Sequence, residues 1–387
     1  MKDVRFGRFR ALVLAVLALV LSLGVGNGQA ISAPGKAAPG PDRALPSAAA
    51  TAPSGPGGAP AAAAPLGKRL PLEPGISVGE GASIGNLQIY PIYSLQQQSI
   101  GEFTTLPLAL RAGTAVVREH EGGAEVGSVE IQNRGRLPIV VLGGTIIKGG
   151  QQDRQIGQDF IIGAYQRVPV DAFCVEPHRW EAVRGGVATG GSFSASGILA
   201  TREVQVAGQF KGNQGEVWSE VAKVNAAVGK QPDSGTLMAT VEDQELVRKR
   251  KELVLQAKSV LFDRPDRDDV VGLAYAVDGQ VRAVRWFAHR DLLRQFGDSL
   301  LETAAMEAVN AQAKATGPSA PPSVAALAPT RVAEFIAARK QIQRSERKAT
   351  QGANENEYRF SDQGYSSKTR LKASPKAPAK PVMDAYY

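Results

Sequence analysis

A stretch of small residues and prolines near the N-terminus sets the first limit on what this chain can fold into. Of the 35 positions from 33 to 67, 27 are Ala, Pro or Gly, and none is aromatic. Such a stretch cannot bury enough apolar surface to offset the entropy lost on ordering. We therefore expect residues 31–70 to form a disordered, extended tether, and we expect the folded part to be a single domain over 71–387.

The first thirty residues have the three-part pattern of a secretory signal peptide. The pattern begins with four basic side chains, Lys2, Arg5, Arg8 and Arg10. The apolar run 11–25 follows, and Gly28 and Ala30 place small residues where a signal peptidase requires them. The alternative is an uncleaved anchor, but about 15 apolar residues are fewer than the roughly 20 that span a bilayer. We predict that residues 1–30 are a signal peptide and the only membrane contact, and that the protein is exported to the periplasm or outside the cell.

The net charge argues against a nucleic-acid partner. The formal charge of the whole sequence is +8, and removing residues 1–30 takes away four basic side chains and one acidic one, which leaves +5. Nucleic-acid-binding domains concentrate Lys and Arg on one face. Here the basic runs 248–251 and 344–348 are typical of solvated helix faces.

Cysteine and histidine are too scarce for most metal centres. The only cysteine is Cys174, which excludes an internal disulfide, an iron–sulfur cluster and a zinc site with two thiolates. Three histidines leave little for a multi-histidine centre. We expect no metal ion and no cofactor.

Apolar runs separated by turn residues predict strands, and longer periodic runs predict helices. The expected strands cover 124–132, 138–147, 159–162 and 168–175, with a hairpin that joins Val270–Val277 to Gln280–Phe287 through Asp278-Gly279. The expected helices cover 215–228, 241–262, 291–315 and 329–348. These elements predict an α+β fold in which several helices pack on one antiparallel or mixed sheet region.

Two segments of the C-terminal half do not fit this pattern. An Ala- and Pro-rich patch predicts a disordered insertion near 316–329. Residues 358–387 have two interpretations, because 358–360 and 382–387 suit closing strands while the whole stretch also suits a ragged tail.

The run GGQQDR, residues 149–154, is the first candidate site. Consecutive glycines expose backbone N–H groups, so a phosphate cradle is one interpretation. The glycine-lysine-serine/threonine ending of a P-loop is missing, and a tight hairpin turn is the favoured alternative. In a regular strand Asp153 and Arg154 point to opposite faces, so they share one ligand only through a bulge or loop.

The run VDAFCVEPHRW, residues 170–180, is the second candidate site. Its apolar strand delivers Glu176 to the strand end, where Pro177 stops the pairing and Arg179 and Trp180 follow. A carboxylate, a guanidinium and an indole suit a polar ligand with a planar ring, since Arg binds phosphate or carboxylate and Trp offers a stacking face. The alternative, equally favoured, is an internal Glu–Arg pair under a packed Trp.

Cys174 and the segment from Gln214 to Trp218 carry weaker signals. One interpretation of Cys174, with His178 nearby in sequence, is a thiolate nucleophile. A lone Cys in an apolar strand is more typical of a small buried hydrophobe. The run QGEVW begins a helix whose first N–H groups suit an anion. Helix capping and core packing are its favoured interpretation.

Three motifs together carry a family resemblance. The runs GGQQDR at 149–154, VPVDAFCVEPHRW at 168–180 and QGEVWSEV at 214–221 resemble the family named for its association with ADP-ribosylglycohydrolases and rhodanese-type phosphatases. The resemblance covers about residues 75–310, and whether it extends to the closing strands near 357–387 is left open. It implies a neighbourhood with enzymes of ADP-ribose and phosphoryl chemistry, and no particular activity.

By matching position, the resemblance assigns the family's polar signature to eight residues, Gln152, Asp153, Arg154, Glu176, Arg179, Trp180, Gln214 and Trp218. The first six form the predicted ligand-binding set. The chain departs from the expected pattern at Pro177-His178, where a glycine before Arg-Trp is expected.

Two functional hypotheses from different classes remain open. In the favoured one the protein is a non-catalytic module of the cell envelope, with an envelope protein as its partner, and the polar residues form a buried network that fixes the fold. In the other the module binds or processes a phosphorylated, nucleotide-like or ADP-ribose-like small molecule through Arg154, Arg179 and Trp180.

Overall fold

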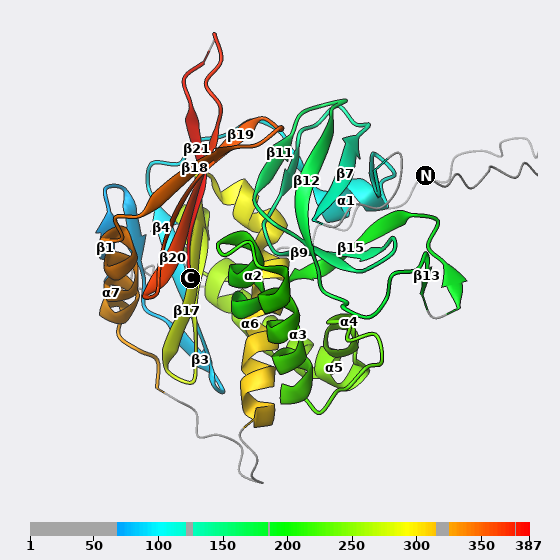
Figure 1. Cartoon of the computed structure of the whole chain (residues 1–387). Coiled ribbons are helices and arrows are strands. Elements are labelled where there is room, and N and C mark those ends of the chain that lie inside the picture. The colour runs from blue at the N-terminus through cyan, green and yellow to red at the C-terminus, as the bar shows by residue number, and fades with distance from the viewer. Residues whose placement is uncertain (1–67, 121–126, 185, 315–324, 376) are drawn as a thin grey trace, which may run out of the picture. The chain divides into compact units, whose positions relative to one another are not determined.

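The computed structural model describes residues 68–120, 127–184, 186–314, 325–375 and 377–387, and it confirms the α+β fold (Figure 1). The predicted signal peptide, nearly all of the predicted tether and most of the predicted insertion lie outside these residues. The strands divide into a ten-stranded sheet, a six-stranded barrel and two small sheets. The sequence predicted one sheet region, but the described strands form several separate sheets.

The large sheet joins the two ends of the described chain. All its neighbouring strands are antiparallel, in the order β1-β2-β4-β16-β17-β21-β20-β19-β18, with β3 beside β4. Its strands are β1 (Leu70–Glu73), β2 (Ile76–Val78), β3 (Ala82–Ile84), β4 (Leu87–Ser94), β16 (Val270–Val277), β17 (Gln280–Phe287), β18 (Ser345–Ala349), β19 (Asn354–Ser361), β20 (Gly364–Leu371) and β21 (Lys380–Tyr386).

The centre of this sheet is covered on both faces. Successive side chains of a strand point to opposite faces, and β4 has buried apolar side chains on both. Leu87 and Ile89 of β4 pack in one core with the helices α5 (Gln244–Phe262) and α6 (Arg290–Lys314). Tyr90 and Ile92 pack in another core with α7 (Pro329–Lys340). Figure 1 shows α7 and α6 on opposite sides of the sheet.

A closed barrel forms the second β structure. Its order is β10-β12-β7-β6-β15-β9, and its strands are β6 (Ala115–Arg118), β7 (Ser128–Asn133), β9 (Thr145–Gly149), β10 (Arg154–Ile156), β12 (Arg167–Cys174) and β15 (Ser192–Leu199). A core that includes Val129, Ile131, Ile147 and Val170 belongs to these strands. The loop between β9 and β10 holds residues 150–153, so the barrel positions the first candidate site.

Short elements complete the described structure. One small sheet has the order β11-β8-β5 and the other pairs β13 with β14; these strands are β5 (Thr104–Thr105), β8 (Ile139–Val141), β11 (Phe160–Ile162), β13 (Val183–Arg184) and β14 (Val187–Ala188). The remaining helices are α1 (Leu106–Arg111), α2 (Arg202–Gln209), α3 (Gln214–Ala227), α4 (Met238–Val241) and the 3-10 turn Arg267–Asp269. A separate core joins α2, α3 and α4 to Met306 of α6.

The predicted helix over 329–348 is too long. The α7 helix begins at Pro329, which suits the first helical turn, and ends at Lys340. Residues 345–349 form the exposed edge strand β18, paired with β19. The charged run SERKA has helix-forming residues, but pairing with β19 overrides that preference.

Two other segments also differ from their predicted extents. The predicted strand over 138–147 breaks into β8 and β9 at Gly143-Gly144, where Gly144 has φ +84°. The predicted helix over 241–262 begins instead at Gln244, because the Asp243 side chain accepts the N–H of Leu246 and caps it.

The β16–β17 hairpin has the predicted bounds, and its turn residues Asp278 and Gly279 have φ +50° and +74°. Residues 358–387 had two interpretations, closing strands or a ragged tail. The structure has closing strands there: the end of β19, followed by β20 and β21.

Candidate functional site

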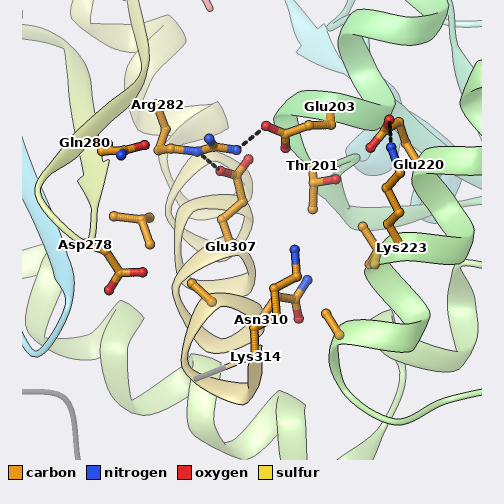
Figure 2. A pocket seen from close by; sticks show the side chains of 14 residues that line it. Thr201, Glu203, Glu220, Lys223, Asp278, Gln280, Arg282, Glu307, Asn310 and Lys314 are labelled. Carbon is orange, nitrogen blue, oxygen red and sulfur yellow. Dashed lines mark hydrogen bonds and ion pairs between the residues drawn. The ribbon is translucent and has the colours of Figure 1, made fainter. Parts of the chain in front are cut away.

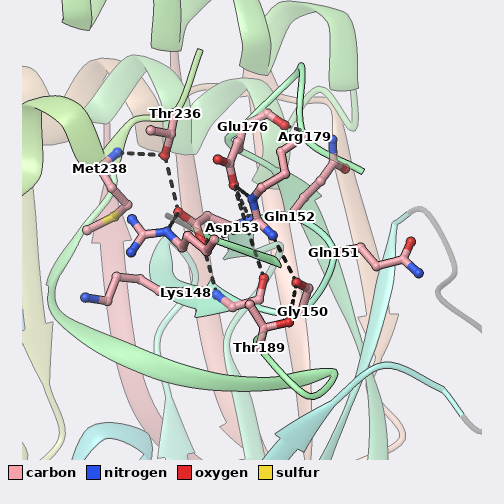
Figure 3. Close-up of polar contacts among 12 residues, drawn as sticks. Lys148, Gly150, Gln151, Gln152, Asp153, Glu176, Arg179, Thr189, Thr236 and Met238 are labelled. Carbon is pink, nitrogen blue, oxygen red and sulfur yellow. Dashed lines mark hydrogen bonds and ion pairs between the residues drawn. The ribbon is translucent and has the colours of Figure 1, made fainter. Parts of the chain in front are cut away.

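Two regions of the described structure gather polar side chains. One is a cavity beside α6 and the β16–β17 hairpin (Figure 2), and the other is a network of polar contacts at the loop between β9 and β10 (Figure 3). The residues that the sequence motifs single out belong to the second region.

Two glycines give the β9–β10 loop its path. Gly149 has φ +131°, and a Cβ there would lie 2.2 Å from the backbone oxygen of Ser192. Gly150 has φ +48°, and a Cβ there would lie 2.2 Å from the Phe193 ring and 2.6 Å from a Glu119 oxygen. A side chain fits at neither position, so the glycine pair lets the loop pass close to β15.

The exposed N–H groups expected of this loop are taken by acceptors of the same chain. The Gly149 N–H donates to Asp153 Oδ1 at 3.0 Å, and the Gln151 N–H donates to Glu119 Oε1 at 3.2 Å. The Asp153 N–H donates to Glu176 Oε2 at 3.1 Å. Three carboxylates of the protein therefore occupy the places that an anion would take in a phosphate cradle.

Arg179 binds the same loop with its whole guanidinium group. Its Nε donates to Glu176 Oε2 at 2.7 Å, and its two terminal nitrogens donate to Asp153 Oδ1 at 3.2 Å and to three backbone oxygens, those of Gly149, Gly150 and Glu181. An Arg side chain has five N–H donors. All five of them have acceptors within the chain, and the Arg179 side chain is 9% exposed.

Asp153 is the centre of this network, and it is fully buried (Figure 3). Its Oδ2 accepts the hydroxyl of Thr236 at 3.2 Å and pairs with Nε of Arg184 at 3.3 Å. Burial raises the pKa of Asp153, as does the nearby charge of Glu176, while Arg184 and Arg179 oppose that rise. The carboxyl is thus buried among compensating charges.

Gln152 completes the network, and Arg154 is connected to it through Glu119. The Gln152 amide donates to the backbone oxygen of Glu176 at 2.8 Å. Arg154 instead binds both carboxylate oxygens of Glu119, at 3.0 and 3.1 Å, and the backbone oxygen of Ser128. The two guanidinium groups are therefore held by different carboxylates. Strand alternation does not explain this, because Asp153 lies in the loop and β10 begins at Arg154.

The other residues singled out have separate surroundings. Trp180 is 46% exposed, although Arg179 beside it is buried. The Gln214 amide pairs with the backbone of Cys174 in both directions, at 2.9 and 2.8 Å, as a neighbouring strand would. Cys174 is fully buried at the end of β12, and burial raises the pKa of its thiol. Because the thiolate is the reactive form, this thiol is poorly placed for a nucleophile.

Three partners in the network were missed in the sequence. Glu119 follows β6, Arg184 ends β13 and Thr236 precedes α4, so all three come from segments far from the motifs. No spacing pattern marks them, because they meet the loop only through the closure of the barrel and the path of residues 175–237. Among the described residues, no group of three His, Cys, Asp or Glu side chains is placed to hold a metal ion.

The network, the barrel and most strands of the large sheet lie within one family match. The family model for the ARG and Rhodanese-Phosphatase-superfamily-associated Protein domain matches residues 75–377. The chain belongs to this family. The matched range contains all eight residues to which the sequence resemblance assigned the family's polar signature. A search of the curated proteins and a search of the solved structures each found no match.

Proposed function

We propose that this protein is an exported, non-catalytic interaction module of the cell envelope, and that its buried polar network stabilises the domain. The observation that carries the proposal is the use of all five N–H donors of Arg179 within the chain. A reactive or ligand-binding Arg keeps donors free for its ligand, and this one has none to offer.

The energetics of the β9–β10 loop support the same conclusion. A phosphate bound at this loop would have to displace the carboxylate of Glu176 or Asp153 from its N–H donors. The displaced carboxylate is buried, with 2% of Glu176 and none of Asp153 exposed. Leaving a buried charge without its partner costs about 3–5 kcal/mol, and phosphate binding at this loop would have to offset that cost.

Exposed apolar side chains beside the network support an interaction with another protein. Trp180, Val183 and Val187 are 46%, 43% and 69% exposed, and the two valines belong to the small β13–β14 hairpin, whose register places them on opposite faces. An exposed Trp is typical of interaction sites. We propose an envelope protein as the partner.

Export is proposed from the sequence of residues 1–30 and the tether that follows. The basic segment, the apolar run 11–25 and the small residues at 28 and 30 support cleavage after Ala30. Cell fractionation followed by N-terminal sequencing should find the protein outside the cytosol and beginning at Ile31. A cytosolic protein that keeps residues 1–30 would contradict export. Among the described helices, none combines the length and apolar character needed to span a bilayer.

The competing function is binding of a phosphorylated or ADP-ribose-like ligand, and one observation favours it. The exposed indole of Trp180 next to Arg179 offers a stacking face for a base. Thermal melting with ADP-ribose, AMP or inorganic phosphate separates the two functions, because a bound ligand raises the melting temperature. We expect no change with any of the three.

A rise in melting temperature with ADP-ribose that is lost in Trp180→Ala would overturn the non-catalytic proposal. The Trp180 side chain is nearly half exposed, so its removal leaves the fold intact. Tyr165→Ala is the matched control, since Tyr165 is 73% exposed and lies outside the network.

A further inference from the structure

The cavity beside α6 contains polar groups that the network does not use. It has a volume of about 380 Å³. Its walls come from the start of α2, the C-terminal half of α3, the β16–β17 hairpin and the C-terminal half of α6. Sites for small molecules usually range from about 300 to 1,000 Å³. The cavity is therefore large enough for a small ligand.

Two buried polar groups at the wall of this cavity have no partner in the described structure. They are the hydroxyl of Thr201 and the Oδ1 atom of Asn310, and their residues are 2% and 7% exposed. Figure 2 shows both at the cavity, with Asn310 on α6 and Thr201 across from it at α2. A buried polar atom without a hydrogen bond lowers stability, and a bound water or ligand that supplies the missing partner removes that cost.

The charges at one side of the cavity neutralise one another. Arg282 donates to Glu307 Oε2 at 2.8 Å and also binds Glu203 (Figure 2). Glu307 accepts two more hydrogen bonds, from the Tyr275 hydroxyl at 2.9 Å and the Arg202 N–H at 2.7 Å. These ion pairs link β17 to α6 and α2. The positive charge of Arg282 is balanced by Glu203 and Glu307.

The whole lining has a small negative balance. Four carboxylate side chains and three cationic side chains line the cavity, which gives a formal charge of −1. A phosphate or carboxylate ligand therefore finds no net positive field here. Short apolar side chains, among them Val224 and Ala311, provide part of the wall.

We propose that this cavity binds a small uncharged polyhydroxylated molecule of mono- or disaccharide size. Each sugar hydroxyl both donates and accepts a hydrogen bond, as do the Thr201 hydroxyl and the Asn310 amide. Carboxylates accept further hydroxyl donors, and the short apolar side chains contact the C–H faces of a sugar ring. The cavity is distinct from the Asp153 network, so this inference does not depend on the proposed function.

Calorimetric titration of the full chain with N-acetylglucosamine, glucose and maltose tests the inference. We expect saturable binding of at least one of these sugars and no binding of glucose 6-phosphate or ADP-ribose. Failure of all three sugars to bind overturns the inference. Binding of glucose 6-phosphate in preference to glucose overturns it as well, because it would show an anion site.

Variants place the bound sugar in this cavity. Asn310→Leu should weaken binding about tenfold, the effect of one lost hydrogen bond, and should not lower the melting temperature, because it removes a buried unpaired acceptor. Thr201→Val, a second variant of similar volume, should weaken binding likewise. Gln256→Leu, at an exposed position of α5 outside the cavity, is the control. Wild-type affinity in both cavity variants would contradict the assignment.

Discussion

At the scale of single residues, Arg179 explains why the loop between β9 and β10 keeps its shape. Its guanidinium group joins two backbone oxygens of the loop, those of Gly149 and Gly150, to the carboxylates of Asp153 and Glu176. Removing it would leave two buried carboxylates facing each other, with Arg184 still paired to Asp153. The ion pairs of Arg179 with Asp153 and Glu176 therefore stabilise the fold only while both partners of each pair are present.

Arg179→Ala should lower the free energy of unfolding by about 3–5 kcal/mol, the usual cost of leaving a buried charge without its partner. Urea denaturation measures it. Arg184→Ala is the matched control, because Arg184 also pairs with Asp153 but its side chain is 33% exposed. That control should cost about 1 kcal/mol or less, since solvent screens an exposed pair. Equal small losses in both variants would contradict a structural role for Arg179.

At the scale of elements, the sequence predicted those that local patterns determine. The β16–β17 hairpin has its predicted bounds because Asp278-Gly279 adopts the positive φ angles that the tight turn requires. The helix predicted over 329–348 ends at Lys340, because Ser345–Ala349 forms a hairpin with the next strand, β19. The helix-forming residues of that run hid the hairpin, and the closure of six strands into a barrel leaves no local signal.

The candidate site shows the same division. The alternation that would make Asp153 and Arg154 face apart requires a regular strand through both, but β10 begins only at Arg154. Asp153 binds Arg179, and Arg154 binds Glu119. The motif residues could be named from sequence, but Glu119 and Thr236 could not. Both reach the loop through tertiary packing. The cavity beside α6 was missed for that reason too, since four separated segments form its walls.

At the scale of the whole molecule, the barrel and the large sheet are held together through long-range contacts. The α6 helix packs in one core with the large sheet, and its Met306 packs in another with α2 and α3. Asn354 of β19 donates to the backbone oxygen of Asp159, and its Oδ1 accepts the N–H of Ile161. Contacts of this kind make the loop at the end of the barrel part of one cooperative structure.

The central claim is that four backbone N–H groups at the β9–β10 loop, those of Gly149, Gly150, Gln151 and Asp153, are bound within the protein and unavailable to a ligand. Amide hydrogen exchange at Gly149, Gly150, Gln151 and Asp153, followed by NMR, tests it most directly. The account predicts slow exchange, limited by global unfolding, with rates that ADP-ribose and inorganic phosphate do not change. Fast exchange in the free protein, slowed when ADP-ribose is added, would contradict it.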